Sequence, residues 1–457
     1  MIQLSKFSKH FTNYTELRVQ ENQSMNITFL NGNLVGNEKK YTSGVSSRVF
    51  LNGSWGFASN PEMNDVNIID TIKFANENAE FLSGRQSKNN KIYEGAAFSH
   101  SHNLGTKKNR ISQKELMDFV KGIDAYIVKK FADVTSRTVG LNFLGMEKTL
   151  LTSVGSNRYS LWPRTMIFVK LGVEENGEPI NAYEIFGGRG HFEDLFTNPS
   201  DLFEDIDKLY EHLKNKSKGV YASAGEKEVI LDADLAGILA HEAIGHTTEA
   251  DIVLGGSIAA NYVNKEVSSH LITLTDYAHS YKGNLCPTPI FVDDEGTKAE
   301  DVVIIKDGVL KEFMHNKETA ATFKTIAKGN ARAYQYFDEP LVRMRNTAIE
   351  PGKSKLRDMI ASIEDGYYFM KTGNGQADST SEFMFAVTIG YEIKNGKLAR
   401  GIRDTTIAGL AFDVLKSVTM VSDDMVWGSW GMCGKKQMIP VGMGGPAIKC
   451  RINVGGK

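Results

Sequence analysis

The 457-residue sequence predicts an α+β fold, with small N-terminal α/β units before a mostly antiparallel C-terminal domain of barrel-like or sandwich form. In the first half, helices with apolar stripes alternate with strand-like segments. After about residue 270, short β segments and Gly-rich turns predominate, with one further helix expected at 354–366. Strands in runs with few helices favour antiparallel sheets over a doubly wound parallel sheet.

Length and composition set the domain expectation. Hydrophobic residues make up 41% and charged residues 24%, which is normal for a globular protein, and the length suits two or three domains. We predict an N-terminal α/β domain at 1–82, a middle α/β domain at 106–219 and a C-terminal domain at 220–457. Residues 83–105 are polar and rich in turn formers, which is typical of a linker.

The N-terminal domain is expected to combine a β-hairpin region with one helix. Residues 24–57 tend to alternate apolar and polar side chains, and Asn-Gly pairs at 31–32 and 52–53 indicate hairpin turns. A helix should follow at 61–82, with candidate buried positions at Val66, Ile69, Ile72 and Phe81. In the linker, His100 and His102 have no acidic or thiol partner nearby, so we expect both to be solvated.

The middle domain begins with a clear helix signal. Ser112 and Glu115 form a capping box, and an apolar stripe follows at Leu116, Phe119, Val120, Ile123 and Ile127. Strands are expected at 139–157, 159–171 and 183–186. The last helix, at 200–213, has a core-type stripe at Leu202, Ile206, Leu209 and Leu213.

The C-terminal domain is expected to be rich in strands, at 271–276, 289–293, 302–306, 384–393 and 417–421. In the helix at 354–366, the inward-facing positions should be Met359, Ile360 and Ile363. We interpret the many glycines as turn residues. The sequence has neither a phosphate loop nor a G-x-G-x-x-G motif. A nucleotide cofactor is therefore unsupported.

The strongest chemical signal is a helix within residues 231–251. Asp232 is a candidate N-cap, and His241, Glu242 and His246 follow near the end of the apolar run. Two imidazoles and an adjacent carboxylate suit a hydrolytic zinc site, because neutral imidazoles bind the metal and a glutamate accepts a proton from water.

The histidine spacing is unusual. Residues at i and i+5 are turned about 140° apart on a regular α-helix and cannot face one ion. Either the helix widens locally to i→i+5 bonding, or it ends near Gly245 so that His246 comes from a turn. Spacing alone equally allows two helix-end histidines beside a solvated glutamate.

Three cysteines compete as a third ligand. Cys450 alternates with Ile448 and Ile452 and should be a core thiol, whereas Cys286 lies at a turn. Cys433 lies among glycines that allow close backbone approach to a metal, although a free surface thiol fits equally well. Glu249 and Asp251 are oxygen alternatives. We favour for them an orienting role toward an imidazole N–H, with a solvated acidic helix end as the alternative.

The segment HEAIGHTTEAD resembles the signature of the TldD/PmbA family, once named modulators of DNA gyrase, and in particular the TldD branch, which carries His-Glu-x-x-x-His. The resemblance covers most of the chain. Other segments that resemble family motifs occur in the family's order along the chain, at 44–58, 187–190, 293–296, 306–310, 329–332, 343–347, 375–378, 433–435 and 440–442.

The resemblance implies a zinc metallopeptidase that cleaves short or unfolded peptides. It implies zinc ligands at His241, His246 and Cys433, with Glu242 as the general base. It also implies a dimer, either a homodimer or a heterodimer with a TldE-type subunit. The sequence departs from the family pattern Cys-Gly-Lys-x-Gly-Gln at one point, because Gln437 follows Lys436 directly. The loop after Cys433 is therefore one residue shorter, and the resemblance does not predict its path.

A thiolate ligand would make the zinc a weaker Lewis acid. We therefore expect activity to depend on tight positioning of an extended peptide, by strand addition to an exposed sheet edge. The principal alternative is a non-catalytic peptide-binding or scaffold protein with a structural metal site.

Composition argues against other classes. The net charge of −2 gives no electrostatic footprint for nucleic acid, which disfavours a role in DNA topology. Three scattered cysteines do not form a disulfide framework, which fits a reducing compartment. The N-terminus has no continuous apolar run and no segment suits a membrane span, so we expect a cytoplasmic protein without membrane contact.

Overall fold

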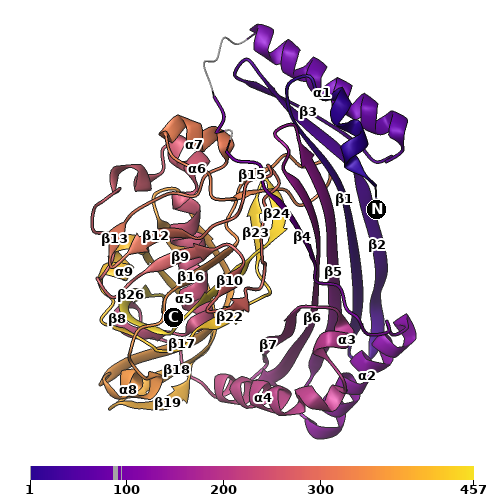
Figure 1. The fold of residues 1–457 in the computed structure, drawn as a ribbon. Helices are drawn as coiled ribbons and strands as arrows, with labels where there is room; N and C mark the ends of the chain where they lie inside the picture. Colours follow the sequence, from indigo (N-terminus) through magenta and orange to yellow (C-terminus); the bar gives the residue numbers. More distant parts are fainter. Residues whose placement is uncertain (1, 86–90, 94, 457) are drawn as a thin grey trace.

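The computed structural model describes residues 2–85, 91–93 and 95–456. A long, curved sheet from the N-terminal part of the chain stands beside a strand-rich C-terminal part (Figure 1). The sheet has the order β3-β2-β1-β5-β6-β4, and β7 also pairs with β6. Its strands are β1 (Tyr14–Leu30), β2 (Asn33–Leu51), β3 (Ser54–Asn60), β4 (Ser99–Asn103), β5 (Ser136–Thr152), β6 (Asn157–Glu175) and β7 (Glu178–Arg189).

Both predicted Asn-Gly turns are present. They join β1 to β2 and β2 to β3, and Asn31 and Asn52 adopt the left-handed backbone conformation that such turns require. All pairings in this sheet are antiparallel except that between β4 and β6. Because β1 also pairs with β5, one sheet joins strands from the first two predicted domains, and the division into domains stays a prediction.

Helices cover both ends of this sheet: α1 (Asp65–Arg85), α2 (Gln113–Lys130), α3 (Phe192–Leu195) and α4 (Phe203–Ser217), with 3-10 turns at Leu4–His10 and Pro199–Leu202. The capping box of Ser112 and Glu115 is confirmed. Every inward residue predicted for α2 and for the stripe at 202–213 is buried, and these side chains form one core with β1, β5 and β6. Leu202 lies in the 3-10 turn just before α4.

The predicted inner face of α1 is partly wrong. Ile72 is buried, but Val66 is 68% exposed and Phe81 57% exposed. The face that packs on the sheet carries Ile68 and Ile72 and, one turn further on, the small Ala75 and Ala79; a Cβ on Gly56 of β3 would lie 2.2 Å from the backbone of both alanines. Close backbone packing, which hydrophobic periodicity does not reveal, therefore selects the buried face.

The C-terminal part contains a closed five-stranded barrel of order β17-β8-β26-β20-β18, closed by pairing of β17 with β18. Its strands and their attached edges are β8 (Gly225–Leu231), β17 (Asp365–Ala377), β18 (Glu382–Lys394), β19 (Lys397–Gly401), β20 (Thr405–Leu410), β21 (Met420–Val421) and β26 (Ile448–Val454). The predicted α+β class with a mostly antiparallel, barrel-like C-terminal domain is confirmed.

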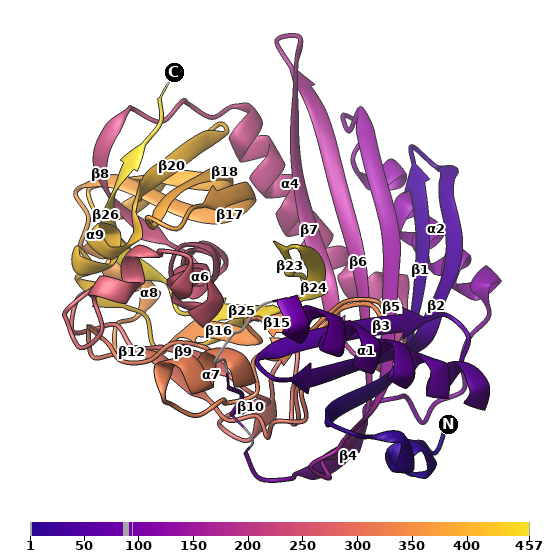
Figure 2. The same cartoon turned by 90° about the horizontal axis from the view of Figure 1, so that it is seen from above.

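A second C-terminal sheet has the order β13-β12-β9-β16-β25-β22. It comprises β9 (Leu274–Tyr277), β12 (Val302–Lys306), β13 (Val309–Leu310), β16 (Asn346–Ile349), β22 (Val426–Gly428) and β25 (Gly442–Gly445). Three small hairpins are β10 (Ser280–Tyr281) with β11 (Asn284–Leu285), β14 (Ala331–Arg332) with β15 (Leu341–Val342), and β23 (Met432–Lys435) with β24 (Gln437–Pro440). The hairpin β23–β24 lies between the barrel and strands β6 and β7 (Figure 2).

The C-terminal helices are short: α5 (Ala233–Ile238), α6 (Ala250–Leu254), α7 (Lys317–Phe323), α8 (Leu356–Ala361) and α9 (Ala411–Lys416), with a 3-10 turn at Ile258–Asn261. The helix predicted at 354–366 is too long, because β17 begins at Asp365 and pairs with β8. The strand predicted at 289–293 is also wrong. Only Val292 bridges to Lys298 there, and Pro289 has no N–H to donate.

Buried ion pairs fasten the N-terminal sheet to the C-terminal part. Asp294 accepts from Lys148 of β5 at 2.8 Å and from Arg158 of β6 at 2.6 Å, and Arg48 of β2 binds Glu295 at 2.6 Å. All five side chains are almost fully buried, so the removal of one partner would leave an uncompensated charge. These contacts fix the sheet beside the candidate site described below.

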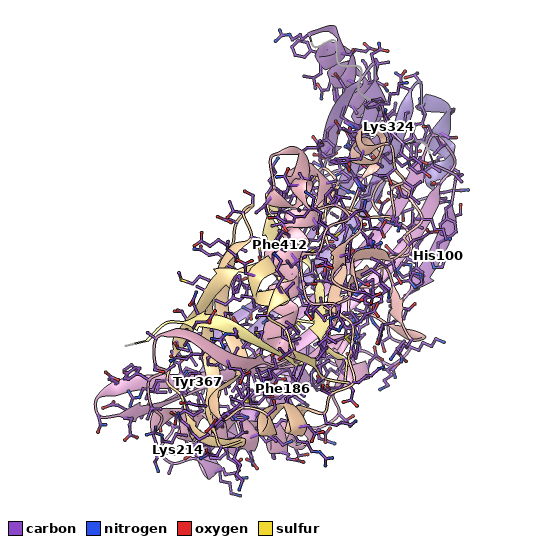
Figure 3. The ribbon with its side chains drawn as sticks, turned by 90° about the vertical axis from the view of Figure 1, so that its left-hand side faces the viewer. His100, Phe186, Lys214, Lys324, Tyr367 and Phe412 are labelled. Carbon is purple, nitrogen blue, oxygen red and sulfur yellow. The ribbon has the colours of Figure 1, made fainter. Side chains whose placement is uncertain are left out.

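The histidines of the linker are not solvated as predicted. Parallel pairing of β4 with β6 brings His100 and His102 against Phe291, with ring centroids 4.4 and 4.7 Å away. Burial, together with the charge of Arg158, lowers the pKa of His102 to about 4. His100 lies on the right-hand side of the molecule in Figure 3, away from Phe412 and Tyr367. Within the described ranges, no helix is long and apolar enough to cross a membrane.

Candidate metal centre

The helix that carries the two histidines changes its bonding at the site. The side chain of Asp232 caps α5 by accepting from the N–H of Ala233 at 2.9 Å, as predicted. A π-helical segment (Leu239–Gly245) follows, and then a 3-10 turn (His246–Thr248). The backbone N–H of His246 donates to the carbonyl of His241, an i→i+5 bond between the two histidines themselves. Of the two expected solutions to the spacing, the chain adopts local widening.

The widened helix brings three candidate ligands together. One ligand atom from each of His241, His246 and Cys433 lies within 4.8 Å of the others. Cys433 Sγ is 3.2 Å from His246 Nε2, and the two imidazole centroids are 5.3 Å apart. Tetrahedral zinc with ordinary bond lengths separates a sulfur and a nitrogen ligand by about 3.6 Å. The arrangement therefore suits one zinc-sized ion.

His241 supplies the clearest evidence that the cluster suits a metal. Its side chain is buried, and neither ring nitrogen has a hydrogen-bond partner among the described residues. An unpaired buried polar group costs about 1–3 kcal/mol, so such groups in a native fold need an explanation. A metal ion would satisfy one of these nitrogens.

The electrostatics favour a thiolate at Cys433. Burial opposes the charged form, but the neighbouring imidazoles of His241 and His246 outweigh it and lower the pKa of Cys433 to about 5. The other two thiols behave in the opposite way, since burial raises the pKa of both Cys286 and Cys450 to about 12. Neither lies in the His241–His246–Cys433 cluster.

Glu249 lies directly behind His246. Its carboxylate is fully buried, and Oε2 is 2.8 Å from His246 Nδ1, so the other ring nitrogen, Nε2, faces Cys433. Burial opposes protonation of His246, but Glu249 and Cys433 prevail and raise its pKa well above the ordinary value. Asp251 forms no hydrogen bond or ion pair with His241 or His246 in the described part of the chain. It accepts from Lys435 Nζ at 2.7 Å.

Glu242 is a partly exposed acid beside His246. Its side chain is 29% exposed, and Oε2 lies 3.8 Å from His246 Nε2. The three candidate ligands are more enclosed, so Glu242 borders the side of the cluster that solvent reaches. A carboxylate in this place can exchange a proton with a water molecule beside the histidines.

Sequence reasoning missed Lys435. Its ammonium lies 3.2 Å from Glu249 Oε2 and donates to the carbonyl of Val342 at 2.8 Å. Lys435 therefore positions the carboxylate of Glu249, which in turn orients His246. The shortened loop, whose path was open, forms a tight hairpin in which Lys435 pairs with Gln437 and Lys436 takes a left-handed conformation. No local pattern distinguishes Lys435 from a solvated lysine.

Comparisons with known proteins show which family the chain resembles over its length. The family model described as PmbA/TldA metallopeptidase C-terminal domain matches residues 224–456, and the model for domain 1 matches residues 15–82. A metalloprotease from Archaeoglobus fulgidus is 30% identical over 97% of this chain and 99% of its own. A zinc metalloprotease TldD homolog from Saccharolobus solfataricus is 29% identical over 92% of each chain. The solved structure of a protein described as a modulator of a DNA gyrase, from Thermotoga maritima, has a TM-score of 0.81 at 19% identity, covering 99% of this chain and 98% of its own.

Proposed function

The chain belongs to the TldD/PmbA family of metallopeptidases, and we propose that it is a zinc-dependent peptidase that hydrolyses short or unfolded peptides. The observation that carries the proposal is the buried cluster of His241, His246 and Cys433 beside the partly exposed Glu242. A closed structural site would need a fourth protein ligand, whereas a catalytic site keeps one position open. The cluster offers three ligands from the described part of the chain, which favours the catalytic form.

In this proposal, His241, His246 and Cys433 would hold the zinc. When bound, zinc supplies a Lewis acid that polarises the scissile carbonyl and lowers the pKa of a water molecule. Glu249 keeps His246 in the tautomer and orientation in which Nε2 faces Cys433. Glu242 accepts the proton of the attacking water and delivers it to the leaving amine.

We place the substrate along the outer edge of β17. That strand pairs with β8 only at 367–369, so along the described chain its later residues, 371–377, have no strand partner on that side. Lys371 ties this edge to α5 through Asp234, at 2.6 Å, which keeps it beside the helix that carries the histidines. An extended peptide could add there as a further strand. Equal cleavage of folded and unfolded forms of one substrate would count against this arrangement.

The test of catalysis is Glu242→Gln, with zinc content and cleavage of an unfolded peptide measured on the same preparation. We expect the variant to keep its zinc and to lose at least about a hundredfold in kcat, because general base catalysis contributes roughly 10²–10⁴. Asp251→Asn is the matched control, since it removes a nearby carboxylate that contacts neither histidine. Unchanged cleavage in Glu242→Gln would refute the assigned role. Zinc without cleavage in the wild type would favour the peptide-binding alternative.

We also propose that the protein works as a dimer, with a second copy or with a TldE-type subunit. The outer edge of β2 pairs with β3 only at 45–51, so residues 33–44 have no strand partner there in the described chain. Leu34, Val35 and Tyr41 are exposed along this segment. A long edge strand with apolar side chains is a template for pairing with another chain. Light scattering of the purified chain distinguishes the two cases: a dimer supports self-association, and a monomer points to a different subunit.

A further inference from the structure

One buried guanidinium binds three backbone carbonyls of the hairpin that carries Cys433. Arg343 Nη2 donates to the carbonyl of Cys433 itself at 2.6 Å, and Nη1 donates to the carbonyls of Lys435 and Gln437 at 3.0 and 2.9 Å. We propose that Arg343 is a positioning residue that sets the location of the Cys433 thiolate relative to the two histidines. The inference rests on the proposed zinc site.

The residue after Arg343 contacts the other half of the site. Met344 is fully buried against Gly245, where a Cβ would lie only 2.0 Å from its Sδ. The carbonyl of Met344 accepts from Arg332, whose second nitrogen donates to the carbonyl of Pro440 at the far end of the hairpin, at 2.7 Å. Residues 343–344 therefore touch both the helix that carries the histidines and the strand pair that carries the cysteine.

The chemistry of Arg343 indicates a geometric role rather than simple stabilisation. Its side chain is fully buried, and no carboxylate among the residues with described positions lies within ion-pair distance of it, although its charge contributes to the lowered pKa of Glu249. A buried cation without a carboxylate is costly, and apolar packing often serves stability equally well. An apolar side chain cannot donate hydrogen bonds, whereas the rigid, planar guanidinium of arginine can bind three carbonyls at once.

Arg345 offers a matched contrast two residues along the chain. It is equally buried and also donates to backbone carbonyls, but it pairs with Asp276 at 2.8 Å, and none of its bonds within the described residues reaches the hairpin β23–β24. If buried arginines here only supported the fold, replacing either one would have the same effect on the site. If Arg343 positions Cys433, only its replacement should change metal ligation.

The experiment loads metal-free protein with Co²⁺ and compares wild type, Arg343→Lys and Arg345→Lys. The readouts are Co²⁺ affinity and the thiolate-to-cobalt charge-transfer band per bound ion. Lysine keeps the charge but cannot hold three carbonyls together. We expect Arg343→Lys to bind Co²⁺ about 10–100-fold more weakly with a reduced band. Arg345→Lys should melt at a lower temperature but keep the band of the wild type.

A second measurement does not depend on metal. Hydrogen exchange on the metal-free proteins should become faster at the amides of 432–440 in Arg343→Lys but not in Arg345→Lys. If Arg343→Lys does not fold, Arg343→Gln replaces it, because a neutral amide removes the buried charge while keeping one donor group. A full band and unchanged affinity in a folded Arg343 variant would overturn the inference alone. Absence of the band from the wild type would overturn the proposed zinc site, and the inference with it.

Discussion

Replacement of Glu249 by glutamine isolates what the carboxylate behind His246 contributes to metal binding. Glu249→Gln keeps the size of the side chain but removes its charge. A hydrogen bond to a charged group is worth about 1.5–3 kcal/mol, and in the folded protein this one joins Glu249 Oε2 to His246 Nδ1 at 2.8 Å. Loss of a group that orients a ligand typically weakens metal binding about 10–100-fold, or about 1.4–2.7 kcal/mol. The two estimates of the lost free energy agree, so we expect Glu249→Gln to bind zinc about 10–100-fold more weakly than the wild type.

The assay is competition for zinc with a chelator of known affinity, at fixed pH and ionic strength. Asp251→Asn is the control, because Asp251 shares Lys435 with Glu249 but makes no recorded contact with a histidine. We expect this control to change zinc affinity by less than about fivefold, because an ion pair that solvent partly reaches is worth up to about 1 kcal/mol. Equal zinc affinity in Glu249→Gln and wild type, or equal losses in both variants, would refute the orienting role.

Two further predictions concern the contact between sheet and C-terminal part. His102 has a folded pKa of about 4, below its ordinary 6.5, so the unfolded chain binds more protons and stability should fall as pH drops from 7 toward 4. Urea unfolding should show a loss of about 1–2 kcal/mol between pH 8 and pH 5 that is missing in His102→Phe; identical pH profiles would contradict this. Asp294→Ala should lower the free energy of unfolding by about 3–5 kcal/mol, because Lys148 and Arg158 remain buried without their partner; a loss below about 1 kcal/mol would show that water replaces the carboxylate.

Local signals in the sequence predicted the elements that local interactions determine. The capping box at Ser112 and the apolar stripe at 202–213 each depend on residues close together in the chain, and both were confirmed. The inner face of α1 was mispredicted because Gly56, on another element, determines which side can approach the sheet. The sequence predicts solvated side chains for His100 and His102, which is wrong because their partner, Phe291, lies far along the chain.

The site shows the same limit. The spacing of His241 and His246 limited the prediction to a local widening of the helix or a helix end near Gly245, because that conflict lies within one element, and the structure shows the widening. The sequence pattern alone left Cys433 level with a free surface thiol, and the resemblance to a family was needed to prefer it. Arg343 and Lys435 were missed as parts of the site because their partners belong to hairpins and loops about 90 or more residues away.

X-ray absorption at the zinc edge of the purified, zinc-loaded protein tests the central claim most directly. We predict one sulfur ligand at about 2.3 Å and two imidazole nitrogens at about 2.0–2.1 Å, with the remaining position held by a light atom. The sulfur contribution should disappear in Cys433→Ser while the imidazole signal remains. A shell without sulfur in the wild type, or one with several sulfurs, would contradict a centre built from His241, His246 and Cys433.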